Sequence, residues 1–354
     1  MRQLTYTVGY VLPGAFLAAW ALGGPAAWWW VPVVAFFAIP VFDELLGHDE
    51  VEPVEGVRAS GADLPLWLWL PTQLLCLAVL LHHAPTLGLV QLLGWSVALG
   101  IISGGGGITV AHELVHRKRR FPRALAELLM LSVLYPWFCV EHVHGHHRHV
   151  ATPVDPATSR RGETVYAFWA RSVFGGLASA WHLESAIVAR QGRSGLADRR
   201  VRYPLAMGLS VLAAGLLGGP WGVLAFIVQA VAGFTLLEVI NYVEHYGLER
   251  QQLPNGRYER VQPHHSWNAT HALTNRLLFN LQRHADHHAW AYRPYDQLRA
   301  WPDAPALPFG YPTMVLIALV PPLWRAVMDP RVAAEHAHRV ETEAPSPGSV
   351  SIRT

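Results

Sequence analysis

Long apolar stretches separated by short polar turns dominate the chain. Six of them approach the roughly 20 mostly apolar residues that a transmembrane helix needs. They cover residues 6–24, 26–46, 65–83, 87–111, 203–218 and 220–243. Turns that contain Gly or Pro join the members of three pairs, at Gly23–Pro25, His83–Pro85 and Gly218–Pro220. The pattern predicts an all-α integral membrane protein with six transmembrane helices.

Two further apolar stretches are less suited to crossing a bilayer. Residues 122–138 are few and include Arg123 and Glu127, and residues 311–327 are interrupted by Pro321 and Pro322. We expect both to lie along or just inside the membrane interface. With the six spans they form one membrane-embedded domain over residues 1–335, and residues 336–354 are expected to be a polar, disordered tail.

Composition agrees with a membrane protein and limits the chemistry. The chain is 52% hydrophobic and 15% charged, whereas soluble domains carry about 25% charged residues. Its two cysteines, Cys76 and Cys139, form no CxxC motif, which excludes a cysteine-ligated iron–sulfur cluster, a rubredoxin-type iron site and a disulfide framework. The first apolar run fits a signal peptide weakly. Because a second run follows almost at once, a retained hairpin is the better interpretation.

Nine of the 20 histidines stand in four short clusters beside apolar stretches. The clusters are His112-x3-His116, His142-x3-His146-His147, His245 within Asn-Tyr-Val-Glu-His-Tyr-Gly, and His284-x2-His287-His288. Neutral imidazole is the commonest nitrogen ligand of transition metals. Six crossings and an interfacial 122–138 segment place all four clusters on one side, so the sequence predicts a metal centre at the membrane surface.

The spacing within the clusters predicts how the imidazoles are shared. Residues i and i+4 share a helix face and can present two rings to one metal region. These pairs are His112/His116, His142/His146 and His284/His288. The extra neighbours, His147 and His287, can turn toward an adjacent metal. Nine nitrogen ligands exceed what one ion accommodates and fit two, although Zn, Cu and Ni also bind imidazole.

Acidic residues accompany the clusters and are candidates for the outer shell of the centre. A ligating imidazole commonly donates its second N–H to a carboxylate. The candidates are Glu113, Glu141, Glu244 and Asp286. Direct ligation and ordinary ion pairing are the alternatives. Soluble di-iron bundles build their centres mainly from Glu residues and paired Glu-x-x-His motifs, whereas histidines dominate these four clusters.

The remaining histidines are expected to play other roles. His144 and His149 fall outside the ligand spacing, and His82 and His83 lie in a turn on the opposite side of the membrane. An outer-shell or structural role is expected for His264, His265 and His271. We expect solvent exposure for His48, His182, His336 and His338.

Basic residues concentrate on the side of the histidine clusters. They include Arg117–Arg120, the stretch 190–202, Arg257 and Arg260. The positive-inside rule makes this side the cytoplasm, with both termini there. A surface including Arg117–Arg120 could dock an acidic electron carrier, and contact with lipid headgroups is the simpler interpretation of any one of these residues.

Two features of the apolar stretches can each be interpreted either as functional or as ordinary packing. The run Gly104–Gly107 lies inside a predicted span, where small residues allow close helix approach. A phosphate-binding loop would need a Lys or a strand–helix context that the sequence lacks. The tryptophans Trp28–Trp30, Trp67 and Trp69 could limit a substrate channel, and a membrane aromatic belt or a core position is the plainer interpretation.

Four motifs resemble those of membrane-bound alkane 1-monooxygenases within the membrane desaturase/hydroxylase superfamily. They are His-Glu-Leu-x-His at 112–116, Glu-His-x-x-Gly-His-His at 141–147, Asn-Tyr-x-Glu-His-Tyr-Gly at 241–247 and Leu-Gln-Arg-His-x-Asp-His-His at 281–288. The third motif is the most specific, and the resemblance covers roughly residues 40–331. One departure is Val143-His144, where these enzymes usually carry Asn followed by Lys or Arg.

The resemblance implies a non-haem di-iron monooxygenase of the bacterial inner membrane that converts n-alkanes to 1-alkanols with O2. The nine histidines would bind two Fe ions, with no catalytic residue beyond these ligands and no flavin, NAD or haem site. Electrons would come from rubredoxin and rubredoxin reductase, the hydrocarbon would come from the bilayer, and no nucleic acid is expected as a partner. A hydroxylase of aryl methyl groups, as in xylene-type enzymes, is the nearest alternative.

Two other functions are less favoured. A lipid desaturase or sterol hydroxylase fits the Asn-Tyr-x-Glu-His-Tyr-Gly element less well. A metal transporter or sensor would hold its ligands near the middle of the membrane, whereas these clusters stand at the ends of the apolar stretches.

Overall fold

A computed structural model describes residues 4–343 except residues 50, 54, 55, 57, 59 and 60. Every regular element in this described part of the chain is a helix, which confirms the predicted all-α class. The first half contains η1 (Leu4–Tyr10), α1 (Val11–Gly23), η2 (Gly24–Trp29), α2 (Trp30–Val33), η3 (Val34–Ala38), α3 (Ile39–Leu46), α4 (Leu64–His83), η4 (Ala84–Thr86), α5 (Leu89–Ile102), η5 (Ser103–Ile108), α6 (Thr109–Val115) and α7 (Arg120–Leu131).

The second half carries three of the four histidine clusters. It contains α8 (Phe138–Glu141), η6 (His142–His146), α9 (His147–His149), α10 (Val165–Gln191), η7 (Gly195–Ala197), α11 (Arg199–His245), η8 (Pro263–His265), α12 (Ala272–Leu277), α13 (His284–Ala289), η9 (Tyr295–Gln297), α14 (Tyr311–Ala318) and α15 (Pro321–Glu343). The elements η3, η5 and η6 are π-helical, and the other η elements are 3-10 helices.

Four helical segments are long and apolar enough to cross a membrane: Tyr6–Leu46, Leu64–Thr86, Leu89–Val115 and Arg199–His245. A fifth is counted if the bent pair Tyr311–Ala318 and Pro321–Val340, at 120°, is one span. Two of the four contain 41 and 47 residues, about twice what a bilayer requires. Each of these two long segments is broken at a glycine with positive φ, Gly24 (60°) and Gly219 (59°).

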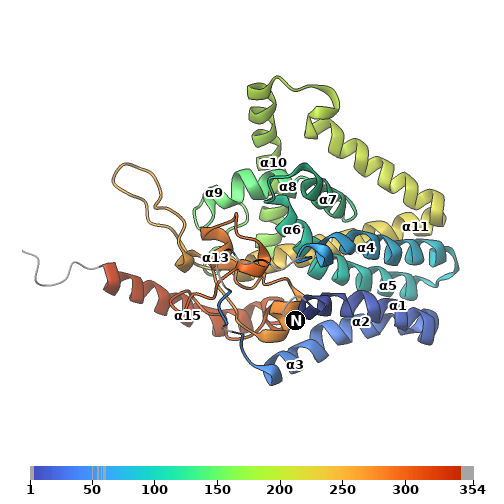
Figure 1. Cartoon of the computed structure of the whole chain (residues 1–354), viewed down its shortest axis with the longest axis horizontal. Coiled ribbons are helices and arrows are strands. Elements are labelled where there is room, and N and C mark those ends of the chain that lie inside the picture. Colours follow the sequence, from blue (N-terminus) through green and yellow to red (C-terminus); the bar gives the residue numbers. More distant parts are fainter. Residues whose placement is uncertain (1–3, 50, 54–55, 57, 59–60, 344–354) are drawn as a thin grey trace, which may run out of the picture.

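The long segments reverse direction at these glycines, as Figure 1 shows for α1 with α2 and for the two arms of α11. In α11, a Cβ added at Gly222 would press on the carbonyl of Ala214. In a straight helix these two residues would stand about 12 Å apart, so the arms fold back on each other. The turns predicted at Gly23–Pro25 and Gly218–Pro220 are therefore present.

The α7 helix keeps the first two histidine clusters on the same side. It contains 12 residues, about 18 Å of helix, which is too short to cross. After it, the chain turns at Leu134, whose φ is 53°, and α8 leads directly into the second cluster. The segment 122–138 therefore does not separate the clusters.

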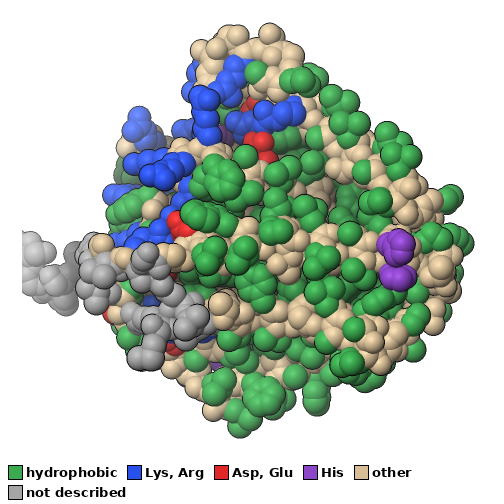
Figure 2. Space-filling view, turned by 45° about the vertical axis from the view of Figure 1, so that its right-hand side comes forward, with side chains coloured by type: hydrophobic (Ala, Val, Ile, Leu, Met, Phe, Trp, Pro, Cys, Tyr) green, Lys and Arg blue, Asp and Glu red, His purple; other side chains and the backbone are tan. Residues whose placement is uncertain are grey.

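Apolar side chains cover the outside of the helices that form the bundle. Strongly exposed examples are Leu22, Phe37 and Leu216, at 79%, 69% and 80%. Figure 2 shows hydrophobic side chains over most of one face, with Lys and Arg gathered toward one end. An exposed apolar belt beside a basic end is typical of a membrane protein, and the chain is one.

The histidine clusters lie at one end of the apolar bundle, and His82 and His83 lie at the other end. Asp63, directly before α4, accepts from Arg117 at 3.2 Å, and Arg117 follows His116. His82 and His83 end the same helix 20 residues later, about 30 Å away. These two histidines therefore lie far from the clusters, as predicted.

The C-terminal helices pack under the third cluster. Tyr242 and Tyr246 of the α11 end contact Trp324 of α15 at ring-centroid distances of 5.0 and 5.3 Å, and Tyr246 donates to Asp329 at 2.8 Å. The α15 helix continues to Glu343, so helix extends into the region expected to be a tail. Residues 344–354 of that expected tail lie outside the described residues.

Candidate metal centre

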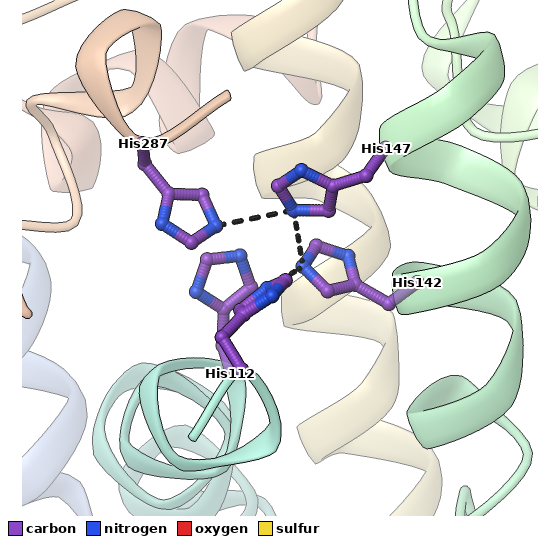
Figure 3. Close-up of side chains that lie close together, drawn as sticks. His112, His142, His147 and His287 are labelled. Carbon is purple, nitrogen blue, oxygen red and sulfur yellow. Dashed lines mark hydrogen bonds between the residues drawn. The ribbon is translucent and has the colours of Figure 1, made fainter. Parts of the chain in front are cut away.

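All nine clustered histidines meet in two adjacent groups. The larger group contains His112, His116, His142, His147 and His287, and the smaller group contains His146, His245, His284 and His288. Within each group, one ring nitrogen of every member lies within 4.8 Å of the others. Figure 3 shows side chains of the larger group converging from three separate parts of the chain.

The first cluster behaves as its spacing predicts. His112 lies in the last turn of α6 and His116 follows that helix as its cap residue. Their rings are 5.8 Å apart between centroids, and both belong to the larger group. An α-helical turn places i and i+4 on one face, which is the predicted reason for their sharing a site.

The second cluster corrects the prediction made from α-helical spacing. His142 and His146 were expected to serve one metal region, but His142 belongs to the larger group and His146 to the smaller. His142 and His147 share the larger group, with their Nε2 atoms 3.0 Å apart. The segment His142–His146 is π-helical, and a π-helix aligns residues i and i+5 rather than i and i+4.

A buried carboxylate accompanies this π-helical turn. Glu141 accepts from the backbone N–H of His146 at 3.1 Å and from the Ser179 hydroxyl at 3.0 Å. A Cβ at Gly145 would press on the Glu141 carboxylate, so only glycine leaves room for it. A side chain that inserts into the backbone ladder is a recognised cause of a helix irregularity.

The third and fourth clusters complete both groups. His245 is the last residue of α11, and its Nε2 lies 3.2 Å from that of His284. His284 and His288 of α13 share the smaller group, while His287 turns to the larger one and lies 3.2 Å from His147 between Nε2 atoms. The sharing predicted for the fourth cluster is therefore observed.

The ring nitrogens have the chemistry expected of metal ligands. Burial lowers the pKa of His116 to about 3, and burial also lowers the pKa of His147, His287 and His288 well below the ordinary range. Neutral imidazole is the form that binds metals. In addition, His146 Nε2 and both nitrogens of His288 are buried without a hydrogen-bond partner among the described residues.

Unpartnered buried polar atoms are costly, and a cation that accepts their lone pairs would relieve that cost. The close approach of Nε2 atoms from different helices has the same explanation, because one cation can hold several lone pairs at one point. The residues present thus fit a pair of transition-metal ions, and the chain has a histidine-rich metal site.

The smaller group stands beside two carboxylates. Asp155 accepts from His146 Nδ1 at 2.8 Å, which leaves Nε2 of that ring to face the group. Burial alone would lower the pKa of His146, and Asp155 raises it above the ordinary value. Glu244 lies 3.2 Å from His284 Nε2 through one carboxylate oxygen. Both carboxylates are buried.

The other acids proposed for the outer shell contact groups outside the imidazole rings. Glu113 pairs with Arg117 at 2.5 Å, and Glu141 binds backbone and Ser179 as described above. Asp286 accepts from Arg293 at 2.5 Å and from the Trp301 indole at 2.8 Å. Within the described part of the chain, Glu244 is the one predicted acid that contacts a clustered imidazole ring.

An apolar cavity reaches the two histidine groups. His112, Glu244 and Tyr311 line one part of it, and Leu12, Phe36, Trp69, Ile102 and Leu237 are among its apolar walls. Of the tryptophans considered as channel limits, Trp69 belongs to this lining. Trp28 instead packs on Gly94, while Trp29 and Trp67 are 49% and 44% exposed.

Comparison with known proteins agrees with these features. The fatty acid desaturase family model matches residues 87–318. Alkane 1-monooxygenase 2 of Pseudomonas aeruginosa is 42% identical, covering 90% of this chain and 88% of the relative, and alkane 1-monooxygenase 1 of the same organism is 41% identical, covering 88% and 85%. The chain belongs to the alkane 1-monooxygenases of the fatty acid desaturase family. The resemblance found in the sequence is therefore confirmed.

A relative whose name carries another substrate is less similar. The hydroxylase component of a xylene/toluene monooxygenase from Pseudomonas putida is 30% identical, covering 93% of this chain and 88% of that protein.

In this alkane 1-monooxygenase family member, Asp155 is the contact that sequence reasoning missed. It stands nine residues after His146, beyond the cluster, and a loop brings it back to the ring. Thr158 donates to the same carboxylate at 2.5 Å and the Ala157 N–H donates at 3.0 Å. In the sequence, Asp155 is indicated by an acidic residue that stands directly before Pro156, shortly after the second histidine cluster.

The segment after the third cluster supports His245. Ser266 Oγ lies 3.5 Å from His245 Nδ1. The neighbouring His265 accepts from the Gln262 N–H at 2.9 Å and contacts Glu259 at 3.0 Å. Burial lowers the pKa of His265 to about 3. With Glu259 and His264 it forms a third set of close side chains of the types that can ligate metals, in which Arg339 also donates to Glu259 at 2.9 Å.

The remaining histidines lie outside the two groups. His144 and His149 are half-buried, His182 is exposed, and His48 is exposed with Nδ1 2.9 Å from the Thr270 hydroxyl. His271 is buried beside Glu44 at 3.4 Å. His336, expected in solvent, is half-buried, and its Nε2 donates to the Gly247 carbonyl at 3.0 Å. The helix α15, which the sequence did not predict there, is the reason.

Proposed function

We propose that this protein hydroxylates the terminal methyl group of n-alkanes to give 1-alkanols, using two iron ions and O2. The observation that carries the proposal is a pair of adjacent histidine groups, one of five and one of four residues, beside an apolar cavity. The relatives named alkane 1-monooxygenase support the substrate class. Each turnover would take one alkane, one O2, two electrons and two protons, and yield one 1-alkanol and one water.

In this proposal the larger group holds one iron and the smaller group the other. Bound there, the irons would supply the reductive activation of O2. Asp155 keeps the proton of His146 on Nδ1, so that Nε2 carries the lone pair. Glu244 lies against Nε2 of His284, the same nitrogen that approaches His245, so it stands on the metal-facing side of that ring. Glu113, Glu141 and Asp286 hold α6, η6 and α13 in place through Arg117, the His146 backbone and Trp301.

The cavity is suited to a hydrocarbon delivered from the bilayer. Its walls are apolar, with His112, Glu244 and Tyr311 among the few polar residues of the lining. A chain that enters end-on would bring its terminal methyl to the histidine groups. Apolar walls also exclude water from the reacting carbon, which favours attack on the alkane over loss of oxidant.

The helices and the charges support a placement of the chain in the membrane. Reversal at Gly24 and Gly219 divides two long segments into four arms, which with α4 and α5–α6 make six crossings of one membrane-embedded domain. The basic end carries both histidine groups, so we place them and the two termini in the cytoplasm of a bacterium, at its inner membrane. The bent α14–α15 pair would lie at that interface.

Electrons would come from rubredoxin, itself reduced by rubredoxin reductase. His116 and His147 are half-buried, and exposed cations follow each of them: Lys118, Arg119 and Arg120 after the first, Arg148 after the second. A basic rim beside partly accessible ligands suits a small acidic carrier. Charges at such a rim affect the association rate and its dependence on salt more than the strength of the bound complex.

Product identification tests the proposal directly. The purified protein, in lipid and supplied with rubredoxin, its reductase and NADH, is given n-alkanes in one series and toluene or xylene in another. We expect 1-alkanols at the highest rate. Benzyl-type alcohols alone would favour the aryl-methyl alternative supported by the Pseudomonas putida relative, and no alcohol from any hydrocarbon would overturn both.

A further inference from the structure

Four consecutive glycines, Gly104–Gly107, form most of the π-helical η5, and the first three of them line the apolar cavity. Three of them have close neighbours on other elements. A Cβ at Gly104 would lie 2.7 Å from the Gly233 carbonyl oxygen. One at Gly106 would collide with the Trp69 indole, and one at Gly107 with the Gln73 amide. Close packing therefore explains why these three residues lack side chains.

Gly105 differs from its three neighbours. A Cβ built there meets one atom within 4 Å, Cδ2 of Leu236 at 4.0 Å. Gly105 is half-buried, whereas the other three glycines are buried, and it lines the apolar cavity. Its φ is not among the positive values, so an L-residue fits the backbone. Neither packing nor backbone conformation requires glycine at this position.

Glycine at such a position carries a cost. In a helix, glycine is less stabilising than alanine, and no close contact with a neighbouring element offsets this loss of stability at Gly105. What a side chain at Gly105 would occupy is the cavity itself. Gly105 stands seven residues before His112, about two helical turns, and His112 belongs to both the cavity lining and the larger histidine group.

We propose that Gly105 keeps the apolar cavity open about two helical turns from the histidine groups and thereby sets the longest alkane the enzyme accepts. This inference rests on the proposed alkane hydroxylation. A short alkane ends before this level and is unaffected by a side chain at position 105. A long alkane must pass it, so a larger side chain excludes long chains while leaving the metal ligands untouched.

The test is a graded series, Gly105→Ala, Gly105→Val and Gly105→Leu, assayed with n-alkanes from octane to hexadecane. We expect the ratio of hexadecane to octane activity to fall in that order, by at least about tenfold for Gly105→Leu. The matched control is Gly208→Leu, because Gly208 is also helical, has no atom within 4 Å of an added Cβ, and is exposed outside the cavity. The control should keep the wild-type ratio.

Thermal unfolding separates a blocked cavity from a damaged fold. Gly105→Ala should unfold at or above the wild-type temperature, whereas Gly106→Ala, which collides with Trp69, should unfold lower. Stabilisation of each variant by added octane or hexadecane gives the same length profile without turnover. If hexadecane stabilises the wild type but not Gly105→Leu, the inference is supported whether or not alcohol is formed. A wild type that forms no alcohol would contradict the proposed function and leave this inference standing. An unchanged profile in folded Gly105→Val and Gly105→Leu overturns it.

Discussion

The two histidine groups use the same kind of ligand in unlike surroundings. In the larger group, His116 and His147 are half-buried and exposed cations follow both. In the smaller group all four rings are buried, and Asp155 and Glu244 stand beside them. A carboxylate on the second nitrogen of a ligating ring raises its basicity and fixes its orientation. Asp155 makes this contact with His146, so the smaller group is the more rigidly held site and the larger group the more accessible one.

This difference suggests that the two groups have different roles in the proposed reaction. The accessible group faces the basic rim, where an electron carrier can approach. The buried group lies beside Glu244, which lines the apolar cavity together with His112 of the larger group. A hydrocarbon and an electron carrier can therefore reach the centre from different directions, one through the membrane and the other from the basic end.

Removing a ligand from the smaller group should have the largest effect. His245→Ala leaves three rings in a group of four, and we expect iron to fall from about two to about one per chain and activity to fall at least about 100-fold. Iron analysis and alcohol formation measure the two effects. His144→Ala is the control, since His144 belongs to neither group. Full iron and full activity in His245→Ala would remove that residue from the ligand set.

Two matched aspartate variants compare the groups at their outer contacts. Asp155→Asn removes the acceptor charge at His146 and should weaken metal retention or activity by about 10–100-fold. Asp286→Asn, beside His287 in the sequence, alters contacts with Arg293 and Trp301 rather than with a clustered ring, so its effect should be a few-fold at most. Titration with an iron chelator orders the two variants. Equal losses of iron or activity in the two variants would contradict the proposed difference between the two histidine groups.

The basic rim should matter only for the carrier. Lys118→Gln with Arg119→Gln should raise the KM for rubredoxin by several-fold at low salt, with the difference shrinking as salt screens the charges. The kcat at saturating carrier should hold. Arg190→Gln with Arg193→Gln, exposed cations at the C-terminal end of α10 rather than beside the larger group, provides the control. A greater effect from this control pair would move the docking surface elsewhere.

The smallest effect is expected at the ion pairs that tie α4 to the larger group. Burial alone would raise the pKa of Asp63, but Arg58 and Arg117 lower it below the ordinary value. A carboxylate with a lowered folded-state pKa stabilises the fold above its unfolded pKa and loses that effect as pH falls. Asp63→Asn should therefore cost about 0.2–1 kcal/mol near pH 7.

Thermal unfolding of this variant between pH 7 and pH 3 checks the sign. The difference from wild type should shrink below about pH 4. A difference that grows toward acid pH would contradict the assigned ion pairs.

Much of the site was predictable because ligand chemistry and helical spacing are local properties. The pairs His112/His116 and His284/His288 lie on ordinary α-helical turns, and the α-helical repeat placed them correctly. The split of His142 from His146 was not predictable from spacing, because the π-helical turn accompanies a Glu141 carboxylate inserted beside Gly145. Asp155 was missed for a related reason: the contact depends on a loop path rather than on a repeat.

The fold shows the same limit. Apolar runs located the membrane helices, and the two charges and short length of 122–138 indicated that this segment does not cross. The helical part of residues 336–343 was not expected, since its polar sequence suggests a tail. Contacts made by α15 with the α11 end, such as Tyr246 with Asp329, hold that helix against the site, and such long-range packing leaves no periodic signal.

We expect two inequivalent irons, one in each histidine group. Mössbauer spectroscopy of protein grown with 57Fe and purified in lipid, combined with an iron count, distinguishes them. We predict about two irons per chain and two distinct signals of equal area, one of which Asp155→Asn alters preferentially. A single iron, one signal shared by both irons, or stoichiometric zinc in place of iron would contradict this expectation.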